Sequence, residues 1–310
     1  MKVPRGFTCA AYVPDAVYVF GGAMEADPKI GFIPPIASVE KFDFTTQRWT
    51  DVTGMPTPTL ASRCVSLDNK IYVLGGRVPI DSNTSVNSNV VQVFDSTRHS
   101  WSAAPRMNRR RAWFGAAVLN RRIYAIGGVG QRTEDSKNGY LDSAEVYDPE
   151  QAVWTLLPHK LAIGRYMLGA TAQSGGLYVV GGSTFLDPDD HRSGKGIDLI
   201  EELEEKRGSF RIRGHLPQEI REMEVFPMDS ESLLLTCKSH VFRLSLHDGS
   251  LAETADAPPH VASHDTAIVL TPHGLFLVGG GGWGNNTAAA FLYIIPPKEE
   301  FKRIFKRDFL

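Results

Sequence analysis

The sequence predicts an all-β protein built from six copies of one strand-rich repeat. An apolar strand that ends in paired glycines recurs through the chain. Its first glycine is found at five positions: Gly21, Gly75, Gly127, Gly181 and Gly279. The copies are about 50 residues apart, except that the last interval is nearly two periods. The segment from Ser232 to Lys238 fits the missing position, with Cys-Lys in place of Gly-Gly.

Each unit is predicted to contain four short strands in the order of the chain. The first is small and apolar, as in Gly115–Leu119, and a short turn leads to the Gly-Gly strand. Short turns between alternating apolar runs are a hairpin signal. A long polar loop then leads to a third strand that ends in an aromatic residue and Asp, and a tryptophan follows in the fourth strand. Three units share these features: Phe42, Asp43 and Trp49; Phe94, Asp95 and Trp101; Tyr147, Asp148 and Trp154.

The later units are less regular. Residues 197–206 are rich in Glu and Leu, which favours a helix by propensity. Leu203 and Phe210 nevertheless fall at the aromatic and tryptophan positions of the repeat, so we predict a strand with a charged face. The fifth unit is shortened. The final strand of the sixth unit is expected at residues 301–305.

Paired glycines, an aromatic residue followed by Asp, and a tryptophan, repeated about every 50 residues, resemble the kelch repeat. The resemblance covers nearly the whole chain. It implies a six-bladed kelch β-propeller with four antiparallel strands in each blade around a central channel. Trp49, Trp101 and Trp154 would then pack between neighbouring blades. We expect one propeller over residues 1–310, with blades at about 4–56, 57–107, 108–161, 162–216, 217–258 and 259–305.

Composition and charge exclude several classes of function. A net charge of −2 and a hydrophobic content of 42% predict a globular protein with no bulk affinity for nucleic acid or an anionic membrane. No apolar run approaches the roughly 20 residues that span a bilayer, and residues 1–5 lack the apolar core of a signal peptide. Cys9, Cys64 and Cys237 are too few and too scattered for a disulfide framework. We therefore expect a cytoplasmic protein in a reducing compartment.

The binding face is predicted from the direction of the strands. If the strands alternate in direction, the loops after the second and fourth strands emerge together on what we call the long-loop face. The loops after the second strands are long and variable: 23–37, 77–88, 129–142, 183–196 and 281–288. Four units carry an arginine at one fixed distance before the Gly-Gly position: Arg5, Arg111, Arg165 and Arg221. A ring of guanidinium groups at the channel mouth would suit a carboxylate; the alternative is that these arginines belong to the fold.

Residues that depart from the repeat are stronger candidates, because the repeat itself cannot explain them. The preferred contact residues are Arg63, Arg77, Trp113, Tyr166, Trp283 and Asn285. Aromatic residues beside arginines are favoured at binding hot spots. We predict that these residues and the arginine ring bind an acidic peptide or loop of a partner protein, as in a scaffold or substrate-recognition subunit. The kelch resemblance implies ubiquitin-ligase or cytoskeletal proteins as partners.

An enzyme is the alternative function. Some kelch-like propellers isomerise acidic sugars such as sialic acid. Acid or base beside the arginines would come from Glu25, Asp27, Asp135 and the cluster of Asp187, Asp189, Asp190 and His191. Those enzymes are typically exported, and this sequence shows no signal peptide, so we place the alternative second. No catalytic residues, cofactor or metal are predicted; His260 and His264, for example, have no third histidine nearby.

Overall fold

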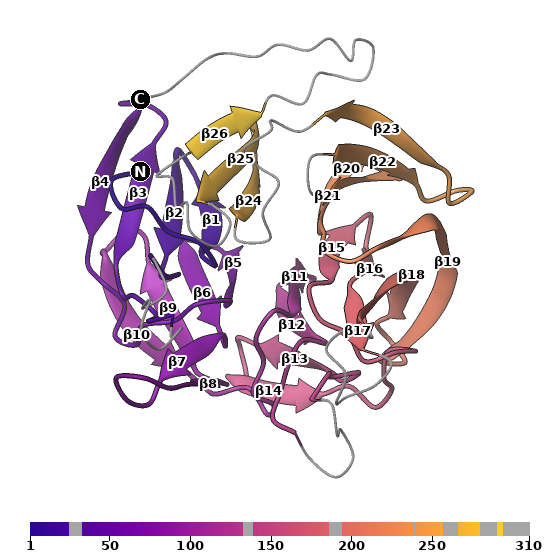
Figure 1. Ribbon diagram of the computed structural model, residues 1–310, viewed down its shortest axis with the longest axis horizontal. Coiled ribbons are helices and arrows are strands. Elements are labelled where there is room, and N and C mark those ends of the chain that lie inside the picture. The colour runs from indigo at the N-terminus through magenta and orange to yellow at the C-terminus, as the bar shows by residue number, and fades with distance from the viewer. Residues whose placement is uncertain are drawn as a thin grey trace.

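The computed structural model describes residues 1–24, 33–132, 139–185, 194–237, 240–256, 266–279 and 290–293. These residues form 26 strands and no helix, so they include no helix that is long and apolar enough to cross a membrane. The strands form antiparallel sheets that are arranged around a common axis like the blades of a propeller (Figure 1). The prediction of an all-β propeller is confirmed.

Each of the first three blades has four strands that follow one another outward from the axis. The first contains β1 (Cys9–Val13), β2 (Ala16–Phe20), β3 (Val39–Asp43) and β4 (Arg48–Val52). The second contains β5 (Arg63–Leu67), β6 (Lys70–Leu74), β9 (Val91–Asp95) and β10 (Ser100–Ala104), and a small hairpin of β7 (Arg77–Pro79) and β8 (Ser85–Asn87) lies in its long loop. The third contains β11 (Gly115–Leu119), β12 (Arg122–Ile126), β13 (Ala144–Asp148) and β14 (Val153–Leu156).

The remaining sheets are less uniform. The fourth contains β15 (Gly169–Gln173), β16 (Gly176–Val180), β18 (Gly194–Glu204) and β19 (Ser209–Ile220), with β17 (Ser183–Phe185) paired to the start of β18. The fifth contains β20 (Glu224–Asp229), β21 (Ser232–Cys237), β22 (His240–Ser245) and β23 (Leu251–Asp256). The sixth contains β24 (Thr266–Thr271), β25 (Gly274–Gly279) and β26 (Ala290–Tyr293).

The number of complete blades differs from the expectation. Five sheets of the described chain have at least four strands, whereas the sixth has three, so the count is five complete blades rather than six. The strand expected at residues 301–305 lies outside the described residues. The expected strand within residues 197–206 is confirmed as β18, in which Leu203 pairs with Phe210 as Tyr147 pairs with Trp154. Packing against neighbouring blades overrides helix propensity here, because β18 buries apolar side chains on both of its faces.

The hydrophobic core lies between the blades. Trp49 packs against Phe276 of the sixth sheet, Trp101 against Phe20 of the first blade, and Trp154 joins a cluster that also contains Tyr72 of the second blade. Each tryptophan therefore lies at an interface with a neighbouring blade, as predicted. Such a sheet cannot bury both faces alone, so each blade is stabilised by its neighbours.

The innermost strands surround the central channel. They contact one another around the axis in the order β24, β1, β5, β11, β15 and β20. A cavity of about 270 Å³ lies between them, and residues of all six sheets line it. Cys9 and Cys64 form a disulfide between β1 and β5. Three scattered cysteines did not predict this bond. The separation of Cys9 and Cys64 by 55 residues is about one repeat period, which brings them onto adjacent innermost strands.

Candidate functional site

The short segment that leads into each innermost strand forms the mouth of the channel. These mouth segments are residues 5–8, 59–62, 111–114 and 165–168 in the first four blades. Each pairs with the long loop of its own blade through one bridge: Gly6 with Ala23, Leu60 with Arg77, Ala112 with Val129, and Tyr166 with Ser183. Mouth segments and long loops therefore share the long-loop face. Successive segments are also hydrogen-bonded to one another, since the Trp113 amide donates to the Ala61 carbonyl at 3.1 Å and the Met167 amide to the Trp113 carbonyl at 2.8 Å.

Three of the four ring arginines are internal to the blades. Arg5, Arg111 and Arg165 have no exposed surface, and they form ion pairs with Glu40, Glu145 and Glu201 of the third strands. In the third blade the Arg111 Nε donates to Glu145 Oε1 at 2.9 Å, and its Nη1 donates to the carbonyls of Gly127 and Ser143, both at 2.8 Å. Burial lowers the pKa of the Arg111 guanidinium, and Glu145 opposes this effect. The alternative that these arginines belong to the fold therefore holds, and they do not face a ligand at the mouth.

The main chain at the position of the ring arginines, which is Thr59 in the second blade, also joins neighbouring blades. The Gly22 amide donates to the Thr59 carbonyl at 2.8 Å, and Gly128 bonds Arg165 in the same way at 2.8 Å. A Cβ atom on Gly21, which has a φ of +57°, would lie 2.2 Å from the Thr59 carbonyl oxygen. Paired glycines are therefore required where the next blade approaches.

The glutamate partners were not identified from the sequence, although a signal for them exists. The second blade has Thr59 in place of the arginine and Gln92 in place of the glutamate, so the two positions change together. Gln92 bonds the Thr57 amide at 2.8 Å and the Thr57 carbonyl at 3.0 Å. In the fifth blade Phe242 replaces the glutamate; there Arg221 is exposed and donates to the Gly194 carbonyl at 2.7 Å.

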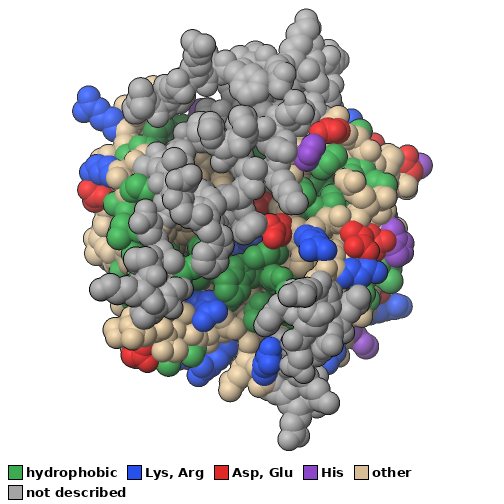
Figure 2. Space-filling model, in the orientation of Figure 1, with side chains coloured by type: hydrophobic (Ala, Val, Ile, Leu, Met, Phe, Trp, Pro, Cys, Tyr) green, Lys and Arg blue, Asp and Glu red, His purple; other side chains and the backbone are tan. Residues whose placement is uncertain are grey.

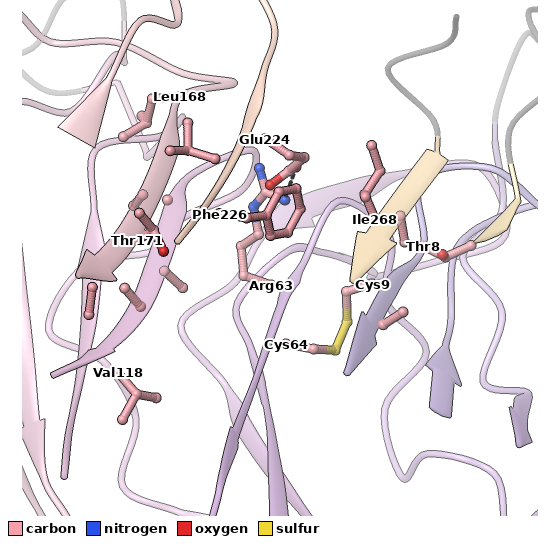
Figure 3. Close-up of a pocket in the computed structure, with 18 residues that line it drawn as sticks. Thr8, Cys9, Arg63, Cys64, Val118, Leu168, Thr171, Glu224, Phe226 and Ile268 are labelled. Atoms are coloured by element: carbon pink, nitrogen blue, oxygen red, sulfur yellow. Dashed lines mark hydrogen bonds and ion pairs between the residues drawn. A yellow bond between two sulfur atoms is a disulfide. The ribbon is translucent and has the colours of Figure 1, made fainter. Parts of the chain in front are cut away.

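Arg63 lies in the channel. Its Nε donates to the Phe114 carbonyl at 2.6 Å, and its Nη1 forms an ion pair with Glu224 of the fifth blade. Figure 3 shows the two charged side chains pointing toward one another from different walls of the cavity. The Arg63 charge is therefore already compensated from within the protein, and a ligand would have to compete with Glu224 for it.

Arg77 and Trp113 are brought together on the long-loop face. The Arg77 guanidinium lies 5.8 Å from the centroid of the Trp113 ring and donates to the hydroxyl and carbonyl of Ser85 at 3.0 and 2.9 Å. Within the described residues no carboxylate pairs with it, and burial lowers its pKa. The Trp113 Nε1 is also buried, and no described residue accepts a hydrogen bond from it. The pair thus combines a half-buried positive charge with a buried donor that has no described acceptor.

Tyr166 extends this surface toward the fourth blade. It stacks on Tyr140 and Phe185, with ring centroids 5.1 and 6.1 Å away. Burial raises the pKa of Tyr166 to about 12, so it stays neutral at physiological pH. The mouth segments of Trp113 and Tyr166 are hydrogen-bonded neighbours, so the two aromatic residues lie on adjacent segments of the long-loop face.

Three exposed arginines lie beside the mouth in the third blade. Arg109, Arg110 and Arg132 are exposed, and no ion pair to them is present among the residues that the structure places. A Cβ atom on Gly130 would lie 3.1 Å from the Arg110 carbonyl, so this arginine borders the third long loop. Figure 2 shows hydrophobic side chains near the centre of the view, with Lys and Arg side chains around them.

Some predicted residues cannot be placed. Trp283 and Asn285 lie outside the described residues. The same holds for the acid and base candidates of the enzyme alternative: Glu25, Asp27, Asp135, Asp187, Asp189, Asp190 and His191. Across the described ranges no group of three or more His, Cys, Asp or Glu residues is arranged to hold a metal ion.

Comparisons with known proteins agree with this architecture. The family described as the KLHDC2/KLHL20/DRC7 Kelch-repeats domain matches residues 2–182. Kelch-like protein 34 of Homo sapiens is 33% identical over 155 residues, which are 47% of this chain and 23% of that protein. Kelch repeat and BTB domain-containing protein 12, also human, is 29% identical over 176 residues, which are 54% of this chain and 28% of that protein. The matched part of the chain thus spans about a quarter of the length of these relatives.

A solved structure supports the fold over almost the whole chain. The structure titled "Structure of YjhT" superimposes with a TM-score of 0.71 and 14% sequence identity, and the match covers 94% of this chain and 95% of the other. At this identity the likeness establishes the propeller architecture.

Proposed function

Because the chain belongs to the kelch-repeat family, whose domain serves as a protein-interaction module, we propose that it binds an acidic peptide segment of a partner protein at Arg77 and Trp113. The observation that carries this proposal is the half-buried Arg77 guanidinium on the Trp113 ring with no described carboxylate partner. The chain would act as a scaffold or substrate-recognition subunit and would release its partner chemically unchanged.

The half-buried Arg77 carries a charge without a described carboxylate partner, which has an energetic cost. A guanidinium that is partly removed from water loses hydration, and a carboxylate partner offsets that loss through charge-assisted hydrogen bonds. Arg77 already has its Nε and Nη2 fixed by Ser85, so little side-chain entropy remains to be lost on binding. An acidic side chain therefore supplies the carboxylate partner that Arg77 lacks among the described residues.

The surroundings of Arg77 favour a peptide over a small ion. Tyr166, with Tyr140 and Phe185 beside it, continues the surface away from Arg77, and aromatic rings bury much area at little entropic cost. The exposed arginines at the rim would attract an acidic chain from solution and speed its association. Arg63 contributes less in this arrangement, because Glu224 already occupies its guanidinium.

Fluorescence anisotropy with labelled peptides tests the proposal. The peptides contain paired Asp and Glu residues next to an aromatic residue, and their controls contain Asn and Gln at the same places. Arg77→Gln should weaken binding of the acidic peptides at least about tenfold, which corresponds to about 1.4 kcal/mol. Arg98→Gln is the matched control, because Arg98 is an exposed arginine of the same blade in the turn between β9 and β10, away from the long-loop face.

Equal dissociation constants for Arg77→Gln and the unmodified protein, or equal binding of the acidic and amide peptides, would overturn the assignment of the site. Binding of sialic acid together with faster exchange of its anomers, in the absence of peptide binding, would replace the interaction module with the isomerase.

A further inference from the structure

The Cys9–Cys64 disulfide lies at the seam between the first and second blades. The two Cα atoms are 5.5 Å apart, which is an ordinary separation for a disulfide. The Ala61 amide donates to the Phe7 carbonyl across the same seam at 2.9 Å, and the Ser62 hydroxyl donates to the Cys9 sulfur at 3.4 Å. The bond thus joins two strands that the fold already holds next to each other.

Both cysteines line the central cavity rather than the outer surface. Their side chains belong to the wall of the cavity of about 270 Å³, and Figure 3 shows the sulfur–sulfur bond between the labelled side chains of Arg63 and Thr8. Cys9 is only 4% exposed. A cavity of this size admits small molecules such as peroxide or a short dithiol, but it excludes a folded oxidoreductase.

We propose that Cys9 and Cys64 form a reversible redox site that small oxidants and thiols reach through the channel. A peroxide oxidises one thiolate to a sulfenic acid and leaves as water after protonation. The second thiol then attacks that sulfur, a water molecule leaves, and the disulfide forms. In total two thiols lose two electrons and two protons, and one peroxide becomes two molecules of water. A dithiol reverses the bond by thiol–disulfide exchange and becomes a cyclic disulfide itself.

The state of the bond affects the mouth of the channel. The mouth segment of the second blade, residues 59–62, directly precedes the strand that carries Cys64. Leu60 in this segment fixes the Arg77 main chain, because the Leu60 amide donates to the Arg77 carbonyl at 3.1 Å and the Arg77 amide donates in return at 2.8 Å. The disulfide therefore restrains the strand next to the residue that holds Arg77. This effect on binding rests on the proposed function, whereas the redox chemistry does not.

The test uses the full chain without a peptide. One sample is treated with hydrogen peroxide and then catalase, and another with dithiothreitol that is afterwards removed. Each is denatured and alkylated, and the peptides are identified by mass spectrometry. Cys9 and Cys64 should be protected and cross-linked after peroxide, and alkylated after dithiothreitol. Cys237 of β21, which lies outside the seam, should be alkylated in the dithiothreitol-treated sample whichever way the pair behaves.

Thermal unfolding supplies the second measurement. The oxidised protein should unfold at a higher temperature than the reduced protein, because the bond restricts the unfolded chain. This difference should disappear in Cys64→Ser and persist in Cys237→Ser. Equal alkylation of Cys9 and Cys64 in both samples overturns the proposal even if a variant fails to fold. A bond that dithiothreitol cannot reduce in the native protein, or an unchanged temperature difference in Cys64→Ser, overturns it as well.

Discussion

Removing one partner of the buried Arg111–Glu145 pair should cost nearly as much stability as removing both. Neither side chain has exposed surface. Arg111→Thr leaves the Glu145 carboxylate buried without its guanidinium, and Glu145→Gln leaves the guanidinium without its carboxylate. Breaking a buried ion pair in this way costs about 3–5 kcal/mol in the free energy of unfolding.

The double variant Arg111→Thr/Glu145→Gln copies what the second blade already contains. There Thr59 donates to the Gly75 carbonyl at 3.1 Å, and Gln92 bonds the main chain of Thr57 through both its oxygen and its nitrogen. In the third blade the position equivalent to Thr57 is Arg109, whose amide already donates to Glu145 at 3.2 Å. The double variant should therefore lose about as much as one single variant, so the coupling energy should have the magnitude of one single loss, about 3–5 kcal/mol.

Urea unfolding followed by tryptophan fluorescence measures these energies. Trp154 reports on the third blade, because its ring lies 5.2 Å from that of Tyr147 beside the substituted strand. Arg121→Thr is the matched control: its ion pair with Asp68 is exposed, so the midpoint should not move. If the losses of the two single variants simply add in the double variant, Arg111 and Glu145 are not energetically coupled and the reasoning is refuted.

Three further predictions concern single positions. Gly249→Ala should lower the free energy of unfolding by about 1–2 kcal/mol, because its φ is +72° and nothing lies within 4 Å of the new Cβ, so only backbone strain is added. Gly127→Ala has a similar φ but places the new Cβ 2.8 Å from a backbone oxygen, so it should lower the free energy of unfolding further. Equal losses in the two variants would contradict the close approach of the blades. Arg221→Ala should change stability by less than about 0.5 kcal/mol, and a loss like that of Arg111→Thr would contradict its exposed position. Burial raises the pKa of Tyr166 from its ordinary value of 10.0 to about 12, so its contribution to the free energy of unfolding is complete below pH 10 and is lost as the pH rises toward 12. Ultraviolet titration of tyrosinate should lose a late component in Tyr166→Phe, and an unchanged curve would count against this.

The repeat was sufficient to predict most of the fold. It placed β18 against the local helix propensity because Leu203 and Phe210 kept the register of Tyr147 and Trp154. It could not predict that the sixth sheet has three strands in the described chain, because the repeat there is degenerate and its final position lies beyond these residues. The disulfide was missed because the cysteines were counted rather than compared with the repeat period.

The recurrence of the ring arginines was visible in the sequence, but the burial of Arg5, Arg111 and Arg165 was not. Spacing alone shows that a residue recurs, and it does not show whether the side chain turns inward or outward. The deciding information was a second position: arginine is buried where the third strand carries glutamate, and it is absent or exposed where that glutamate is replaced. Charge balance explains this rule, because a buried guanidinium needs a buried carboxylate.

This rule also indicates where specific binding can arise in such a propeller. A side chain at a repeat position, such as Arg111, makes contacts that stabilise the fold. Its substitution therefore mainly lowers stability and has less effect on the binding of a partner. Arg77 lies one residue beyond the paired glycines of a blade that has lost the buried ion pair, and it is held by Ser85 of its own hairpin. Its charge is therefore not required to close the ring of blades. A surface built from such residues can change its partner while the propeller stays intact, which is the physical reason for testing Arg77 and Trp113 before any residue of the repeat.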